Sequence, residues 1–291
     1  MLTNCHFRKI LVTRIAMNAG TECSFEDLLT FAHRLADASA EAIMPFFRAR
    51  GAVENKGEKG SFDPVTAADR AAEEVIRSLV EREMPAHALL GEEFGDHVPA
   101  GGGEAEYRWI IDPIDGTRSF ISGIPLWGTL IGLERGGAML LGVMNQPFTG
   151  ERYWCDETSA WYRGPEGTRA LTTRSCPRLS EATLLSTGPE FFADPQDLAR
   201  FEHLSTRVNM RRFGGDCYCY CMLASGHVDL VVEAGLAAYD IAALVPIIER
   251  AGGRITTWEG EDASKGGRIV ASGDPALHDA ALECLAGAAA S

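Results

Sequence analysis

Two aspartates and a threonine lie together in one stretch whose residue types could carry chemistry. In WIIDPIDGTRSF, residues 109 to 120, Asp112 and Asp115 stand three positions apart around a proline, directly after an apolar run. Because proline removes a backbone donor and restricts the residue before it, the pair suits a strand end better than a helix. Gly116 then allows a turn, and Thr117 can begin a helix whose amides suit an anion. An ordinary turn would use the same residue types, so the pair alone does not define a site.

Two further acids stand at expected junctions between elements. Glu92 follows a predicted strand at 87–90, and Asp240 begins a predicted helix; each alone could be a solvated charge or a helix cap. With Asp112 and Asp115 they make four carboxylates in a chain that has no His/Cys ligand cluster. Because acids near one point repel unless a cation joins them, this set favours an all-oxygen site for a hard ion such as Mg²⁺. Two such ions could hold the attacking and leaving oxygens of a phosphoryl displacement.

The elements that must position these acids change character along the chain. A capping signature at Ser24 opens a predicted helix that reaches about Arg48, a mobile loop or lid is expected at 51–64, and a second helix begins at Thr66 or Asp69. A meander of strands and then an alternation of strands and helices predict layered sheets and helices. The expected strands are 87–90, 107–111, 126–133, 139–145, a pair within 153–161, 183–186, 208–213, 228–233 and 269–272, and the later helices are 195–206, 216–225, 241–251 and 275–286.

Composition argues against several classes of partner. The 291 residues carry 27 basic and 41 acidic side chains, a formal charge of −14, so neither nucleic acid nor an anionic membrane surface is an expected partner. No stretch approaches the roughly 20 apolar residues of a membrane span. The eight cysteines lack the paired spacing of an oxidised scaffold, which predicts a reducing cytoplasm. Residues 1–24 are expected to be a loosely ordered N-terminal extension.

The acidic motifs resemble those of a known family. Gly91-Glu92-Glu93, Asp112-Pro-Ile-Asp-Gly-Thr117 and Tyr239-Asp240-Ile-Ala-Ala243, in this order, are similar to the signatures of the inositol monophosphatase family of Mg²⁺-dependent phosphatases. The likeness covers about residues 25 to 290. It implies an α/β fold, an α+β layered sandwich of helices and sheets, with residues 25–291 as a single catalytic domain of two α/β halves that forms a homodimer.

The same resemblance implies roles for individual residues. Asp69 would pair with Thr117 to orient the attacking water, although without the motif Asp69 would be interpreted as a helix-surface charge. The Gly116 and Thr117 amides would hold the phosphate. Two or three Mg²⁺ ions per active site would be bound by Glu92, Asp112, the carbonyl of Ile114, Asp115 and Asp240, and these residues would also contact the substrate.

Other stretches look closest to the histidinol-phosphate phosphatase branch of the family; they are 119–131, 212–218 and 226–233. Histidinol phosphate carries a cationic amine, and Asp216 or Glu233 could pair with it. Asp216 could equally cap the following helix, and inositol-specific relatives also carry a glutamate at the second position. Arg212 fits a phosphate contact or a strand-edge charge.

These features predict hydrolysis of a small phosphate ester. The expected reaction converts L-histidinol phosphate to L-histidinol and phosphate, in histidine biosynthesis, by attack of water activated by metal and by Thr117 with Asp69. One alternative is an inositol-1-monophosphatase or a broad sugar-phosphate phosphatase with the same machinery. The other is a non-catalytic binding protein of the same fold.

Overall fold

An eight-stranded mixed sheet carries the first half of the chain. The computed structural model describes residues 23–49, 53–55, 64–99 and 105–287, so residues 1–22 of the expected extension and most of the expected loop at 51–64 lie outside the described residues. The strands are β3 (Ala88–Gly91), β4 (Gly95–His97), β5 (Tyr107–Asp115), β6 (Gly128–Arg135), β7 (Ala138–Gln146), β8 (Glu151–Cys155), β9 (Ala160–Gly164) and β10 (Gly167–Ala170). Their order in the sheet is β10-β9-β8-β7-β6-β5-β3-β4.

A five-stranded sheet carries the second half. Its strands are β11 (Thr183–Ser186), β12 (Met210–Phe213), β13 (Leu230–Leu236), β14 (Arg254–Thr257) and β15 (Gly267–Ser272). They lie in the order β12-β11-β13-β15-β14, with β11 parallel to both of its neighbours. Separately, β1 (Val53–Asn55) pairs antiparallel with β2 (Pro64–Thr66).

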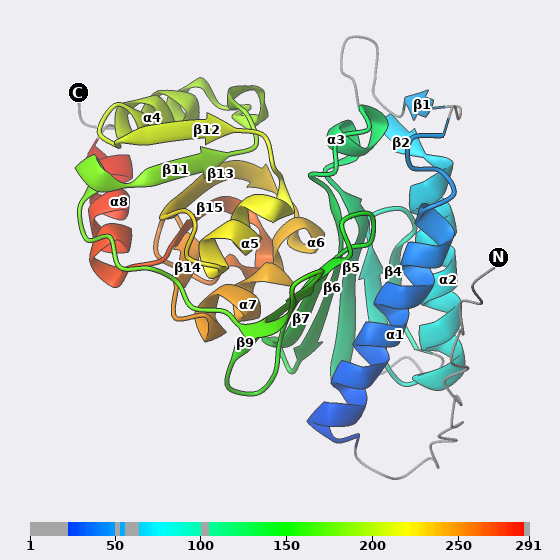
Figure 1. The fold of residues 1–291 in the computed structure, drawn as a ribbon. Helices are drawn as coiled ribbons and strands as arrows, with labels where there is room; N and C mark the ends of the chain where they lie inside the picture. The colour runs from blue at the N-terminus through cyan, green and yellow to red at the C-terminus, as the bar shows by residue number, and fades with distance from the viewer. Residues whose placement is uncertain (1–22, 50–52, 56–63, 100–104, 288–291) are drawn as a thin grey trace, which may run out of the picture.

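Helices fill the space between the sheets and cover their outer faces (Figure 1). The α-helices are α1 (Phe25–Ile43), α2 (Ala67–Glu83), α3 (Thr117–Ile121), α4 (Pro195–Ser205), α5 (Cys217–Ala224), α6 (Ala238–Ile241), α7 (Leu244–Arg250) and α8 (Pro275–Gly287), and the 3₁₀ turns are η1 (Leu179–Glu181), η2 (Pro189–Phe191) and η3 (Ala263–Lys265). The pair α1 and α2 packs on the first sheet, α5 to α7 lie between the sheets, and α4 with α8 covers the second sheet. This order of layers confirms the predicted α/β sandwich. Among the described helices, none has the length and hydropathy to cross a membrane.

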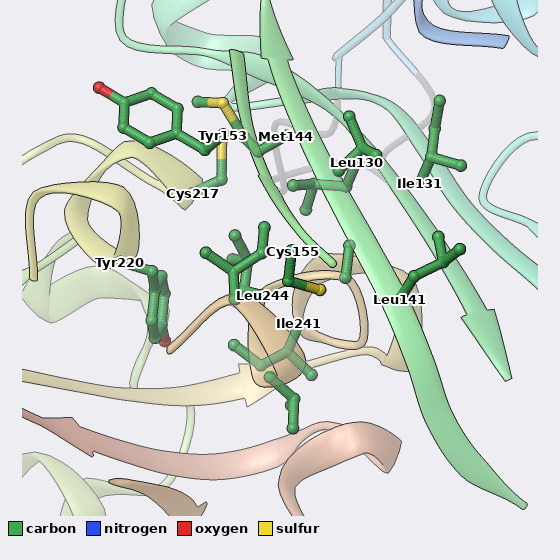
Figure 2. Close-up of a cluster of buried hydrophobic side chains, with 14 of the residues drawn as sticks. Leu130, Ile131, Leu141, Met144, Tyr153, Cys155, Cys217, Tyr220, Ile241 and Leu244 are labelled. Atoms are coloured by element: carbon green, nitrogen blue, oxygen red, sulfur yellow. The ribbon is translucent and has the colours of Figure 1, made fainter. Parts of the chain in front are cut away.

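A shared core joins the two halves of the chain. Figure 2 shows Met144 of β7 near Cys217, which comes from α5, and both side chains are buried. The start of α7 approaches β7 closely because position 142 is glycine: a Cβ on Gly142 would lie 1.8 Å from the carbonyl oxygen of Ala243. The packing therefore fixes Asp240 and its helix against the sheet that carries the other acids.

The first helix begins as predicted and ends earlier. Ser24 forms the expected capping box at the start of α1. The helix ends at Ile43 instead of continuing to about Arg48. Pro45 has no N–H for the next helical hydrogen bond, and the Phe46 N–H donates to the Ile43 carbonyl at 2.9 Å instead. The proline therefore ends the helix before the predicted boundary.

Several other boundaries differ from those predicted. The expected loop at 51–64 contains β1, the strand expected at 107–111 runs on as β5 to Asp115, and the helix expected at 241–251 is divided into α6 and α7. The short strands β4, β10 and β14 were not predicted, because β4 and β10 have no buried side chain that would give a hydrophobic alternation. In β14 only the two central residues are buried, which is too short a signal.

Candidate active site

The acidic pair lies where β5 leaves its regular pairing. The register of β5 against β6 shifts between Asp112 and Asp115, and such a bulge accommodates the proline between them. Gly116 follows with a φ of +87°, a left-handed conformation that favours glycine, and α3 begins at Thr117. The Thr117 hydroxyl donates to the Ile114 carbonyl at 3.1 Å. The predicted order of strand end, turn and helix start is therefore present.

Asp240 joins this pair from the other half of the chain. One carboxylate oxygen from each of Asp112, Asp115 and Asp240 lies within 4.8 Å of the others. Backbone groups orient two of the acids: the Cys217 N–H donates to Asp115 Oδ2 at 2.5 Å, and the Ala237 N–H donates to Asp240 Oδ2 at 2.7 Å. Carboxylates gathered in this way could bind a metal ion, and an all-oxygen donor set suits a hard cation.

Burial and mutual repulsion raise the pKa of the gathered carboxyl groups. Burial, followed by the charges of Asp240 and Asp69, raises the pKa of Glu92 to about 8. Burial also raises the pKa of Asp240 to about 6. Burial is again the largest cause for Asp112 and Asp115, whose pKa values lie well above the usual range. These groups can all be ionised at neutral pH only if positive charge lies among them, which is what a bound cation supplies.

The raised pKa of Glu92 predicts how the stability of the metal-free protein depends on pH. In the unfolded chain this carboxyl titrates near pH 4, so above that pH the metal-free folded state holds a proton that the unfolded state has lost. Its free energy of unfolding should therefore fall, by about 2 kcal/mol between about pH 6.5 and 8.5. Below about pH 6.5, buried histidines such as His87, whose pKa burial lowers to about 4, act in the opposite direction.

Thermal melts in EDTA and in saturating Mg²⁺ would measure this effect. The difference in Tm between the two conditions should widen as the pH rises from 6.5 to 8.5, because Glu92 holds its extra proton only in the metal-free folded state. A constant difference in Tm across this interval would contradict the prediction.

Asp69 lies beside the acidic cluster and not on the solvent side of its helix. It is in the first turn of α2, and its side chain is only 1% exposed. Its charge contributes to the raised pKa of both Glu92 and Asp112, which places its carboxylate close to theirs. The interpretation of Asp69 as a helix-surface charge is therefore wrong.

A cavity of about 240 Å³ opens beside these acids. It brings together Glu92, Asp112, Ile114, Asp115, Gly116, Thr117, Asp216, Glu233 and Asp240, all of which were predicted site residues. Arg212 does not line it. That residue lies on β12, an edge strand, and is exposed, in keeping with the strand-edge interpretation.

The sequence reasoning missed the remainder of the cavity wall, which is formed by Arg118, Ser186, Thr187, Phe191, Phe192, Ala234, Gly235 and Leu236. Part of it had a usable signal. Ser186 and Thr187 end and follow β11, and the parallel strand β13 carries Glu233 to Leu236. Ligands commonly bind at the carboxyl ends of parallel strands, so the predicted strand at 183–186 pointed to this wall.

Glu73 is a second missed residue with a clear structural role. It is fully buried on α2 and forms an ion pair with Arg77 at 2.6 Å. Its carboxylate also accepts the N–H groups of the two residues after Glu92, at 2.7 and 3.1 Å, and so holds the turn that carries Glu92. The signal was its position four residues after Asp69, on the same face of the predicted helix.

We expect Glu73→Gln to weaken activation by Mg²⁺ by about 10-fold to 100-fold while the rate at saturating Mg²⁺ changes much less. The physical reason is that the variant loosens the turn that carries Glu92 and leaves the acids themselves in place. Phosphatase activity titrated with Mg²⁺ measures the effect. Glu83→Gln is the matched control. Glu83 also lies on α2 and forms a salt bridge, with Arg34 at 2.7 Å, but it does not line the cavity. Equal Mg²⁺ dependence in both variants would contradict the role of Glu73.

The layered sandwich with a buried acidic cluster at a strand end is the architecture of a metal-site phosphatase, and comparison with known proteins agrees. Residues 24–290 match the inositol monophosphatase family, and the chain belongs to this family. It is thus a phosphatase of the inositol monophosphatase type, as the motifs predicted.

Individual relatives are named for different activities. The chain is 41% identical to a chloroplastic bifunctional phosphatase of Arabidopsis thaliana, over 93% of this chain and 79% of that protein. It is 38% identical to a histidinol-phosphatase of Chlorobaculum parvum, over 86% of this chain and 93% of the relative. A solved structure of an inositol monophosphatase from Zymomonas mobilis superposes with a TM-score of 0.79 at 39% identity, covering 91% of this chain and 100% of that one. Likeness alone therefore gives the reaction class and leaves the ester open.

Proposed function

We propose that this phosphatase hydrolyses L-histidinol phosphate to L-histidinol and phosphate, a step of histidine biosynthesis. The observation that carries the proposal is Asp216, an acid that lines the cavity beyond the candidate metal ligands. Burial and then the charge of Glu233 raise the pKa of Asp216 to about 7, so this carboxylate lies in a place that favours a cationic partner. Histidinol phosphate supplies one in its amine, whereas inositol phosphate has none.

Glu233 is the weaker candidate for binding the amine. Both of its carboxylate oxygens already accept hydrogen bonds: one from the Thr187 N–H at 2.8 Å, and the other from the Tyr220 hydroxyl at 2.7 Å. By contrast, Asp216 Oδ2 accepts a long bond of 3.4 Å from Ser119 Oγ. Asp216 also has a positive φ of 45°, and such strained non-glycine residues cluster at functional sites. We assign amine recognition to Asp216 and a supporting role to Glu233.

The chemistry follows from the residues around the cavity. Two or three Mg²⁺ ions, bound by the carboxylates and the Ile114 carbonyl, would supply Lewis-acid polarisation of the phosphate and lower the pKa of water. Asp69 accepts the proton of the attacking water, with the Thr117 hydroxyl orienting that water. The N–H groups of Gly116 and Thr117, at the turn into α3, donate to phosphate oxygens. Asp216 orients the alcohol portion through its amine.

Phosphate release from L-histidinol phosphate and from inositol 1-phosphate, each with Mg²⁺ and with EDTA, tests the proposal. We expect kcat/KM to favour L-histidinol phosphate by at least about tenfold, because a buried acid without its cation penalises the wrong ester, and we expect EDTA to abolish both activities. A preference for inositol 1-phosphate would mean that the proposed substrate is wrong and the proposed mechanism stands. The likeness to the inositol monophosphatase of Zymomonas mobilis would agree with that outcome.

Three expectations from the sequence remain predictions. They are the homodimer, the cytoplasmic location, and the division into an extension at 1–24 and one catalytic domain at 25–291. The non-catalytic alternative has little support, since the cavity gathers every predicted metal ligand. Negligible turnover of both esters in Mg²⁺, together with copurification in a large complex, would restore it.

A further inference from the structure

One aromatic ring on the cavity wall stays open to solvent. Phe191, at the end of η2, lines the cavity and is 39% exposed. The next residue, Phe192, also lines the cavity but is buried, with its ring 4.7 Å from that of Phe201 and 6.3 Å from that of Trp258. Phe192 therefore anchors η2 in the core of the second half, and this anchor leaves Phe191 at the rim.

A residue from the first half of the chain contacts the Phe191 ring. The guanidinium carbon of Arg118, on α3, lies 4.4 Å from the centre of the Phe191 ring, and Arg118 also forms an ion pair with Glu190 at 3.0 Å. The adjacent residue of α3, Ser119, donates to Asp216. The Phe191 ring and the Asp216 carboxylate are thus tied to consecutive residues of one helix. Both groups are in place before a ligand enters.

We propose that Phe191 is a specificity-determining residue that stacks against the imidazole ring of the substrate. This inference rests on the proposed function. In L-histidinol phosphate the phosphate and the imidazole stand at opposite ends, with the amine between them. A molecule whose phosphate lies at Gly116 and Thr117, and whose amine lies at Asp216, directs its imidazole toward the rim.

The chemistry of the rim suits such a ring. Arg118 covers one face of the Phe191 ring and leaves the solvent-exposed remainder for a ligand. Aromatic pairs gain from offset or edge-to-face contact, and the protonated fraction of an imidazole adds a cation–π attraction. Inositol and glycerol phosphates have no aromatic ring, so Phe191 should favour the ester that carries an imidazole.

Three variants test the proposal: Phe191→Leu, Phe191→Trp and the control Phe148→Leu. Phe148 matches Phe191 closely, since it is 41% exposed and carries Arg48 at 4.4 Å, but it does not line the cavity. We expect Phe191→Leu to lower kcat/KM for L-histidinol phosphate by about 5-fold to 10-fold, mainly through KM. For glycerol 2-phosphate the change should stay within about twofold. Phe191→Trp should retain the activity of the natural protein, and Phe148→Leu should leave kcat/KM unchanged for both esters.

The outcomes separate this inference from the proposed function. Suppose that the natural protein prefers L-histidinol phosphate. If Phe191→Leu then lowers kcat/KM equally for both esters, or for neither, the stacking role is wrong while the proposed function stands. If the natural protein has no such preference, the proposed function fails first. The inhibition constant of L-histidinol, measured with glycerol 2-phosphate as substrate, gives a second readout. It should rise by the same factor in Phe191→Leu, and an unchanged constant would overturn the stacking role.

Discussion

Asp112→Asn should lower kcat/KM by about a thousandfold or more at saturating Mg²⁺. Asp112 is buried and lies within the group of three acids whose oxygens approach one another to within 4.8 Å. Loss of its charge removes a ligand from that group, and metal polarisation of a phosphoryl group stabilises the transition state by several kcal/mol. Phosphate release from L-histidinol phosphate, followed over a Mg²⁺ titration, measures the loss.

The stability of the same variant shows whether the fold is kept. Asp112 Oδ1 accepts the Ile114 N–H at 3.0 Å, a bond that an asparagine oxygen can also accept. Because burial and the neighbouring acids raise the pKa of Asp112, removing its charge should leave the Tm in EDTA unchanged or higher. Asp279→Asn, at an acid 63% exposed, is the surface control and should retain full activity. Retained turnover in Asp112→Asn at saturating Mg²⁺ would refute the metal assignment.

Asp69→Asn should lower kcat by about 10²-fold to 10⁴-fold with little change in KM. Asp69 is buried beside Glu92 and Asp112 but does not line the cavity, so it can accept a proton through Thr117 without binding the ester itself. Steady-state kinetics at saturating Mg²⁺ separate this effect from a loss of metal. A large rise in the Mg²⁺ requirement, with kcat restored by excess Mg²⁺, would make Asp69 a metal-positioning residue instead.

Thr117 provides the matched pair of variants for that proton path. Thr117→Ser keeps the hydroxyl and should retain most of the activity, whereas Thr117→Val keeps the shape and should show a loss similar to that of Asp69→Asn. The proposed mechanism makes the two residues one unit, so the double variant Asp69→Asn with Thr117→Val should be little worse than either single variant. Additive losses would mean that the two side chains act independently.

The acids of the predicted metal site could be singled out from the sequence because each stands at a junction between elements, and the resemblance to the family then implied their role as ligands. An aspartate pair around a proline, followed by glycine, has few conformations open to it, and the bulge at the end of β5 with Gly116 in the left-handed region is one of them. The order of strands and helices gave the layers for a similar reason. Periodicity depends on which face each element buries, and this is visible one element at a time.

Phe191, Arg118 and Glu73 could not be assigned in the same way. Phe191 and Phe192 are identical in type and adjacent in sequence, yet one packs into the second core and the other lines the cavity rim. The difference arises because Phe192 packs against Phe201 and Trp258 in the second core, while Arg118 from the other half of the chain contacts Phe191. Glu73 would look like an exposed helix charge unless the backbone that it holds after Glu92 were known.

The sequence by itself determined the acids that could bind metal and the layered order of elements, since these depend on residue type, spacing and local backbone preference, and its resemblance to the family supplied the reaction class. Only the tertiary structure decided which groups meet: Asp240 with Asp112 and Asp115, Asp69 behind Glu92, and Phe191 with Arg118 and Asp216 at the rim. These contacts depend on how the two sheets pack through α5 to α7, and close packing of many side chains sets that geometry collectively. No single motif encodes it.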